Sequence, residues 1–242
     1  MSCVASSANT SRRPFSGDRL VAIDRVAVIG GTGAEGFGLA CRWAAAGIEV
    51  VIGSRAQERA TEAAARITAT VAEARAEGLA NADAAAAADV VAVVVPFAGQ
   101  AAIYKSIAGH LGPEAVVVDC TAPLAAAVGG RAARVLGIWE GSAAQQAAAL
   151  LPEGVSLGAA FHSLAASSLG KLDTDLEGDV LACGPKAAKP VLKELAEAIP
   201  KLRYVDAGPL ENARLVEPLT ALLIGINRRY KLEGAGIKIT GL

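Results

Sequence analysis

The residues with the clearest chemical meaning are three glycines near the start of the chain. Gly31, Gly33 and Gly36 have the spacing G-x-G-x-x-G and directly follow the apolar run at residues 26–29. We expect Gly31 to allow a tight turn, Gly33 to let the backbone approach a pyrophosphate, and Gly36 to let a helix pack near the strand. The free N–H groups and the dipole at that helix start favour an anion. The pattern therefore predicts a dinucleotide site.

A second group of candidate residues follows the next predicted strand, residues 49–52. NAD-binding proteins usually carry a carboxylate here, which accepts a hydrogen bond from the ribose 2′-hydroxyl. This chain has Ser54 and Arg55 instead, and arginine suits bidentate contact with a phosphate. Arg59, one helical turn further, adds a second cation, and Thr32 in the glycine-rich loop adds a hydroxyl. These residues predict NADP, whose 2′-phosphate they would hold.

Other polar residues allow more than one interpretation. His162 is compatible with a general acid, a wall of the cofactor cleft or a core histidine, whereas His110 fits a surface position at a helix end. Arg131 and Arg134 fit either an acidic substrate tail or a solvated loop. Cys120 follows a predicted strand, but no neighbouring base in the sequence would activate its thiol.

Alternating strands and helices must position these residues. Apolar runs predict strands at residues 26–29, 49–52, 89–95, 115–119 and 155–161. A first helical pattern ends at residue 46, and further ones cover residues 56–77, 81–88, 100–111 and 142–151. This alternation is typical of the α/β class and predicts a doubly wound parallel Rossmann sheet with right-handed crossovers.

The last third of the chain follows a different pattern. Strands are expected at residues 179–183 and ending at Val205, with an amphipathic helix between them whose apolar face is Val191, Leu192, Leu195 and Ile199. A wide apolar stripe follows, made of Leu215, Val216, Leu219, Leu222, Leu223 and Ile226. Such a stripe must be buried, either on its own domain or in a homodimer, which we favour. We expect a flexible extension (1–24), an NADP-binding Rossmann domain (25–163) and a small C-terminal substrate and dimerisation lobe (164–242).

Composition excludes several classes of function. Of the 242 residues, 53% are hydrophobic and 4% aromatic, and the 23 basic and 24 acidic residues give a net charge of -1. There is no basic run for nucleic acid and no apolar run of about 18 residues for a membrane. The four cysteines are scattered, which fits reduced thiols in a cytoplasmic protein better than disulfides or a metal site. Residues 1–24 lack the apolar core of a secretory signal.

Two segments together resemble one known family. Residues 30–55 begin G-G-T-G-A-E-G-F-G-L-A and end V-V-I-G-S-R, and residues 206–220 read D-A-G-P-L-E-N-A-R-L-V-E-P-L-T, followed by G-A-G-I-K at residues 234–238. The chain is similar here to the F420H2:NADP oxidoreductases, with the resemblance running from residue 26 to the C-terminus. The resemblance implies a Rossmann domain, a small C-terminal lobe, a homodimer, and hydride transfer between the nicotinamide C4 and the deazaflavin C5 of coenzyme F420.

The resemblance also assigns roles to individual residues. The residues implied to hold the 2′-phosphate are Thr32, Ser54, Arg55 and Arg59. Pro96 and Phe97 match a pair lining the cofactor cleft. His162 matches a histidine near the nicotinamide and the deazaflavin, and Thr220 matches a threonine on the substrate side, so these two are the candidate catalytic residues. Direct hydride transfer needs no metal and no covalent nucleophile.

The chain departs from the family on the side of the second substrate. The family's His-Thr-Ile-Pro reads H-S-L-A at residues 162–165, Pro218 replaces a serine, and residues 121–139 differ. These departures leave room for an NADP-dependent dehydrogenase of a pterin one-carbon carrier such as methylene-tetrahydromethanopterin. The predicted cleft has few titratable groups, and its low polarity permits a further alternative, an NADP-sensing protein without turnover.

Overall fold

The computed structural model describes residues 23–242. Residues 1–22 of the expected flexible extension therefore lie outside the described part. The last two residues of that extension belong to the fold. Ile23 packs into the core and its N–H donates to the Glu194 carboxylate, while the Asp24 carbonyl accepts a hydrogen bond from Glu49.

A six-stranded parallel sheet forms the centre of residues 23–242. Its order is β3-β2-β1-β4-β5-β6, so the chain changes direction of winding between β1 and β4. The strands are β1 (Arg25–Ile29), β2 (Glu49–Ser54), β3 (Ala76–Ala80), β4 (Val90–Val93), β5 (Val116–Asp119) and β6 (Ser156–Ala159). This topology confirms the predicted doubly wound Rossmann fold. Ligands of such sheets bind at the carboxyl ends of the strands beside the switch point.

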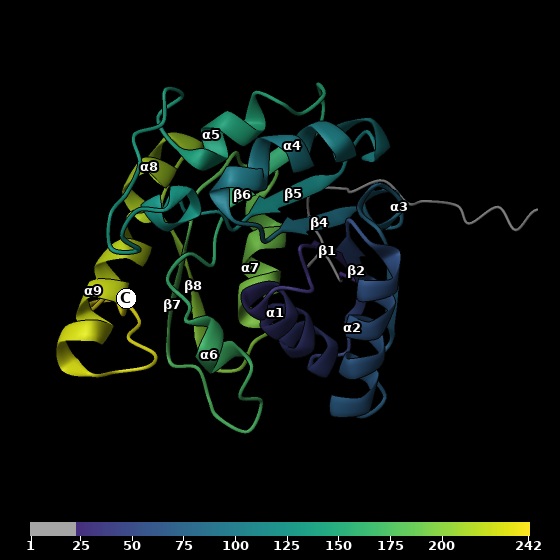
Figure 1. Cartoon of the computed structure of the whole chain (residues 1–242), viewed down its shortest axis with the longest axis horizontal. Helices are drawn as coiled ribbons and strands as arrows, with labels where there is room; N and C mark the ends of the chain where they lie inside the picture. The colour runs from purple at the N-terminus through teal and green to yellow at the C-terminus, as the bar shows by residue number, and fades with distance from the viewer. Residues whose placement is uncertain (1–22) are drawn as a thin grey trace, which may run out of the picture.

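Helices cover both faces of the sheet (Figure 1). One face carries α1 (Ala34–Ala45), α2 (Gln57–Thr70) and α7 (Lys189–Glu197), and the other carries α3 (Asn81–Ala86), α4 (Phe97–Ile107) and α5 (Ala143–Ala148). Along β1, Val26 and Val28 enter the first layer, whereas Ala27 and Ile29 enter the second. Because both faces of the inner strands β1, β2, β4 and β5 are buried, these four strands read as mostly apolar runs.

The prediction of one helix over residues 56–77 is wrong. Helix α2 ends at Thr70, and residues 76–80 form β3, the edge strand paired with β2. The sequence A-E-G-L-A contains no β-branched residue, so its composition gives no strand signal. Strand β3 and helix α2 approach each other closely at Gly78, where a Cβ would lie 2.2 Å from the backbone nitrogen of Thr61 in α2.

The C-terminal part extends the same core. Strands β7 (Gly178–Ala182) and β8 (Leu202–Asp206) form a parallel pair, which an antiparallel bridge between Ala159 and Cys183 joins to β6. The predicted apolar face of α7 is buried in the layer that also holds α1 and α2. The division into two domains at residue 163 stays a prediction.

Two residues of α1 fasten the segment after β6 to the Rossmann core. The buried Arg42 guanidinium donates to the backbone carbonyls of Ser168, Leu169, Lys171 and Thr174, around α6 (Ala166–Leu169). The indole N–H of Trp43 donates to the carbonyl of Leu195 in α7 at 2.9 Å. The Arg42 bonds fix the loop that begins just after His162, and the Trp43 bond holds α7 against α1.

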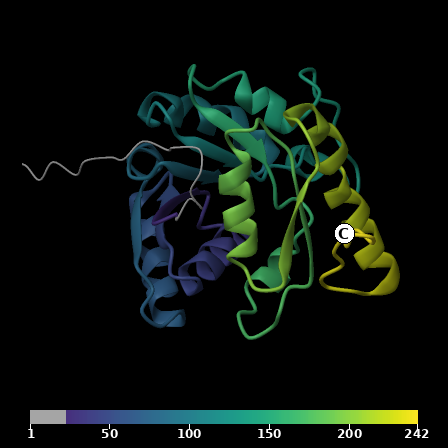
Figure 2. The same cartoon turned by 180° about the vertical axis from the view of Figure 1, so that it is seen from behind.

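The predicted C-terminal stripe is buried in part and exposed in part. It lies on α8 (Ala213–Val216) and α9 (Leu219–Tyr230), at one edge of the molecule in both views (Figures 1 and 2). Val216 and Leu223 are buried, but Leu215 and Leu222 are 62% and 57% exposed. In residues 23–242, no helix combines the length and the apolar composition that crossing a membrane requires.

Candidate active site

The glycine-rich loop joins β1 to α1 at the switch point. Gly30 has a φ of +87°, and a Cβ there would lie 2.2 Å from the carbonyl oxygen of Val94. The tight turn therefore requires a glycine at Gly30, a position outside the predicted spacing. Gly31 lies in the same turn, and a Cβ on it would lie 3.0 Å from the carbonyl oxygen of Val28 and 2.9 Å from Cδ1 of Ile52 in β2. The adjacent pair of glycines in the sequence is the signal that would have identified the turn.

The start of α1 exposes backbone donors. Gly33 is the N-cap, and no side chain caps this helix. A Cβ on Gly36 would lie 2.7 Å from the carbonyl oxygen of Gly30, so the first turn packs directly on the loop. The first N–H groups of a helix have no acceptor within the helix. The geometry suits an anion, and the binding roles of Gly33 and Gly36 remain predictions.

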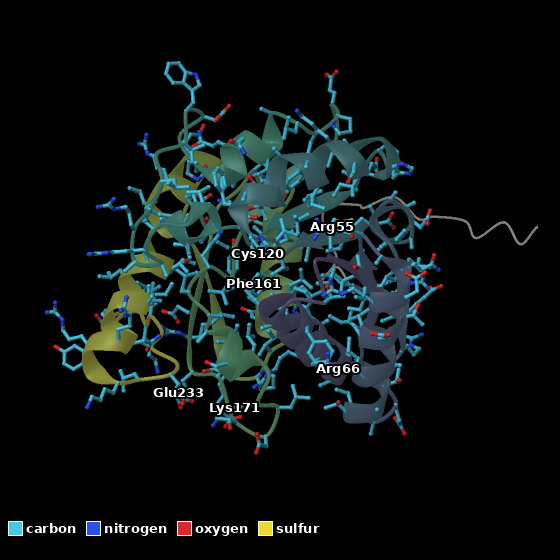
Figure 3. All side chains as sticks on the ribbon, in the orientation of Figure 1. Arg55, Arg66, Cys120, Phe161, Lys171 and Glu233 are labelled. Carbon is cyan, nitrogen blue, oxygen red and sulfur yellow. The ribbon has the colours of Figure 1, made fainter. Side chains whose placement is uncertain are left out.

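The residues predicted to hold the 2′-phosphate lie around the end of β2. Ser54 is the last residue of the strand, and its buried hydroxyl accepts a hydrogen bond from the N–H of Ala56. Arg55 and Arg59 are exposed, and neither forms an ion pair within residues 23–242. Because β1 and β2 are parallel neighbours, Thr32 belongs to the same edge of the sheet. Figure 3 labels Arg55 in this region.

One carboxyl in the loop was not expected. Glu35 lies in the first turn of α1, is half-buried, and has its pKa raised to about 8 by removal from water. It is also close enough to Cys120, after β5, to raise the pKa of that thiol electrostatically. A neutral carboxyl therefore faces the carboxyl ends of the strands, beside the expected pyrophosphate position.

Pro96 and Phe97 lie across the switch point from the loop. Pro96 is the exposed N-cap of α4, and Phe97 is its half-buried first residue. The N–H of Val94 donates to the carbonyl of Ile29, which holds the end of β4 against the glycine-rich loop. The two residues are thus at the edge where a bound dinucleotide would pass, and their contact with it remains a prediction.

The structure brings His162 and Thr220 together although 58 positions separate them. The Thr220 hydroxyl donates to the backbone carbonyl of His162 at 2.7 Å. The His162 side chain is 3% exposed, and neither ring nitrogen has a hydrogen-bond partner among the described residues. Burial lowers the pKa of His162 to about 4, so the imidazole is neutral at pH 7.

An unusual backbone conformation presents His162. Phe161 has a φ of +71°, which side chains other than glycine rarely adopt and which costs free energy. Its ring is fully buried and meets Trp43 edge to face, with ring centroids 5.6 Å apart. Figure 3 shows Phe161 beside Cys120 near the middle of the molecule. Core packing thus holds the turn, and this turn ends β6 two residues earlier than the sequence predicts.

A buried polar network beneath this site was also missed. Asp119, at the end of β5, accepts hydrogen bonds from the Tyr104 hydroxyl at 2.7 Å, the Gln100 amide at 2.9 Å and the Thr121 N–H at 2.9 Å. Burial raises the pKa of Asp119 to about 6 in spite of these bonds. The sequence signal was available, since an aspartate ends an otherwise apolar strand.

Other candidates lie away from this cluster. Arg131 and Arg134 are exposed in the segment between β5 and α5, and His110 is exposed at the end of a 3-10 turn. Burial raises the pKa of the Cys120 thiol well above its usual value, so the thiol is not an activated nucleophile. A cavity of about 600 Å³ opens at the other, amino-terminal end of β6, between Leu151, Pro185 and Leu210. It is apart from the glycine-rich loop.

Comparisons with known proteins agree on one family. The family described as NADP oxidoreductase, coenzyme F420-dependent, matches residues 25–123. The F420-dependent NADP reductase of Methanothermobacter thermautotrophicus is 43% identical over 226 residues, which cover 92% of this chain and 97% of the relative. That of Methanocaldococcus jannaschii is 38% identical, with 90% and 99% covered.

Solved structures agree with these relatives. A protein of an Arthrobacter species, named provisionally as an F420-dependent NADP reductase, superposes with a TM-score of 0.74 at 25% identity, covering 89% of this chain and 98% of that one. The pyrroline carboxylate reductase of Plasmodium falciparum, solved with NADP bound, has a TM-score of 0.56 at 10% identity and shares the fold.

Proposed function

The chain belongs to the family of F420-dependent NADP oxidoreductases, and from this premise we propose that it transfers a hydride between NADP(H) and coenzyme F420. The observation that carries the proposal is similarity along nearly the whole length of both chains, which includes the glycine-rich loop and the C-terminal segment. The resemblance seen in the sequence is thereby confirmed.

The NADP half of the site comprises the glycine-rich loop and the end of β2. The uncapped start of α1 would bind the pyrophosphate through backbone N–H groups. Arg55 and Arg59 are free to pair with the 2′-phosphate, with hydroxyls from Ser54 and Thr32. A carboxylate at the end of β2 would repel that phosphate, and this chain has none there.

The second half of the site is argued from His162. When both substrates are bound, the nicotinamide C4 and the deazaflavin C5 exchange the hydride directly. The protein then needs to align two planar rings and exclude water. His162 is neutral and buried, and it has two nitrogens free to donate to or accept from polar atoms of a ring. We therefore propose that His162 orients the two rings. Thr220 supports it by its hydrogen bond to the His162 backbone carbonyl.

The test is oxidation of NADPH by the purified protein with three acceptor conditions: F420, methenyl-tetrahydromethanopterin, and no acceptor. We expect turnover with F420 alone. Turnover with the pterin alone would overturn the assignment in favour of a one-carbon dehydrogenase. Tight NADPH binding without turnover on either acceptor would indicate the sensing protein.

We also propose that the protein works as a homodimer in the cytoplasm. Most of the exposed large apolar residues belong to the C-terminal segment, namely Leu215, Leu222, Tyr230, Leu232, Ile239 and Leu242. A surface of this kind favours association with a second copy. The described cysteines, Cys41, Cys120 and Cys183, are free and buried, as is usual in a reducing compartment.

A further inference from the structure

One buried carboxylate joins the C-terminal helices to the Rossmann core. Glu217, at the end of α8, is 1% exposed. Its two oxygens accept one hydrogen bond each from the N–H groups of Ala143 and Ala144, both at 2.9 Å. These are the first two residues of α5, and the third N–H, that of Gln145, is capped by Ser142. The contact is therefore a two-pronged clamp between α8 and α5.

The clamp is continuous with the buried network at the end of β5. The amide nitrogen of Gln100 donates both to Asp119 at 2.9 Å and to the carbonyl of Ala143 at 3.1 Å. The Ala143 residue is thus held by Glu217 at its N–H and by Gln100 at its carbonyl. Glu217 has no ion-pair partner within residues 23–242, and burial raises its pKa to about 7.

On its other side, Glu217 leads to the loop that carries His162. The carbonyl of Glu217 accepts a hydrogen bond from the N–H of Thr220 at 3.2 Å. The Thr220 hydroxyl in turn holds the His162 carbonyl. Phe161, just before it, has a strained φ, so the position of His162 depends on contacts that hold this turn from outside.

We propose that Glu217 is a positioning residue for the second substrate: it clamps the C-terminal helices to α5 and thereby fixes, through Thr220, the turn that presents His162. The proposal rests on the proposed function, which assigns His162 to orientation of the two rings and has Thr220 on the substrate side. It predicts that loosening the clamp affects the F420 side of the site and spares the NADP side, which is built on β1, β2 and α1.

The first test is Glu217→Gln in the full chain. The amide oxygen can accept one of the two N–H groups, but its NH₂ group faces the other donor. We expect the KM for F420 to rise at least about tenfold, with kcat and the NADPH Kd changed less than about twofold. Glu211→Gln is the matched control, since Glu211 is exposed six residues earlier. An equal loss of NADPH binding and F420 use would overturn the proposal.

A second variant cuts the same contact from the other side. Ala143 is the first residue of α5, where proline is tolerated because its missing N–H has no partner within the helix. The preceding Ser142 already has the extended backbone that a following proline requires. Ala143→Pro should raise the KM for F420 as Glu217→Gln does. The change in KM in the double variant, expressed as a free energy, should be smaller than the sum of the two single changes. Additive effects would show that Glu217 does not act through α5.

Hydrogen exchange tests the clamp without any F420. Peptides covering residues 160–165 should exchange faster in Glu217→Gln than in the wild type and in Glu211→Gln. If the wild type does not use F420, the proposed function fails, but this measurement still decides the clamp. Unchanged exchange in that turn would overturn the inference.

Discussion

At the scale of single residues, we expect Arg55 to determine the choice of cofactor. It is an exposed cation without an ion-pair partner among the described residues, beside a strand end that lacks the usual carboxylate. A charge-assisted bond to phosphate contributes about 1.5–3 kcal/mol. Arg55→Glu should therefore raise the KM for NADPH tenfold to a hundredfold and leave that for NADH nearly unchanged, as steady-state kinetics would show.

Arg131→Glu provides the comparison for this change, because Arg131 is an exposed arginine far along the chain, after β5. It should leave both Michaelis constants unaltered. Equal losses with NADPH and NADH in Arg55→Glu would remove the phosphate-binding role.

Glu35 predicts a pH dependence of cofactor binding. Its pKa is raised to about 8 by burial, so the carboxyl is neutral below that pH and charged above it. The charged form would repel the pyrophosphate expected at the same loop. The NADPH Kd, followed by fluorescence, should rise as pH increases through about 8 and should stay flat in Glu35→Gln. The exposed Glu58, changed to glutamine, should keep the wild-type dependence; if Glu35→Gln keeps it too, another group is responsible.

His162 predicts a loss of stability in acid. Its pKa is lowered to about 4 in the folded protein, against an ordinary value near 6.5. The folded state therefore resists protonation, so the contribution is complete above pH 6.5 and is lost as pH falls towards 4. The difference corresponds to about 3 kcal/mol.

Urea unfolding between pH 4 and 7.5 measures this effect. The free energy of unfolding should fall less steeply with acid in His162→Gln than in the wild type. The other histidine of the chain, the exposed His110, gives the control, since His110→Gln should follow the wild type. Parallel curves for all three proteins would contradict the assignment.

At the scale of elements, the edge strand β3 depends on one glycine. A Cβ on Gly78 would overlap the backbone of Ala60 and Thr61, at 2.3 and 2.2 Å, and backbone cannot move aside as a side chain does. Gly78→Ala should lower the free energy of unfolding by about 1–3 kcal/mol. Gly99→Ala, in open space on α4, should instead raise it by about 0.5–1 kcal/mol. Chemical denaturation compares the two; similar effects would mean that α2 and β3 separate easily.

The elements also show how packing overrides local signals. The sequence predicts α1, α7 and most strands because apolar periodicity along each segment matches what the core buries. It predicts a helix through residues 71–77, where the tertiary structure places a turn and β3. Hydrogen bonds with β2 stabilise residues 76–80 as a strand, although the amino-acid composition of this segment does not favour one.

At the scale of the whole molecule, the exposed leucines on and beside α8 and α9, namely Leu215, Leu222 and Leu232, predict a second copy. Leu222→Asp should dissociate the proposed dimer, because a charge cannot be buried unpaired in an apolar interface. Light scattering with size-exclusion chromatography gives the mass in solution. Val128→Asp tests the same change at an exposed apolar residue of another region, and it should leave the mass unaltered. A wild-type protein that is already monomeric would refute the dimer.

The glycine spacing, the alternation of strands and helices, and Ser54 with Arg55 could all be identified from the sequence. Each of these features depends on residues close together in the sequence: those of a turn, of a repeating apolar pattern, or of a strand end. Ser54 and Arg55 already predicted NADP, and the resemblance to the family extended the prediction to F420.

Which distant polar residues come into contact depends on how the chain folds in three dimensions. The contact of Thr220 with His162 and the clamp of Glu217 on α5 join residues 58 to 74 positions apart. The network around Asp119 joins side chains 15 and 19 positions apart. A lone glutamate in an amphipathic segment gives the same pattern whether it is solvated or buried. Its burial depends on how the crossover connections bring helices together at the carboxyl ends of the strands. That arrangement adds the proposed substrate side to the cofactor-binding fold.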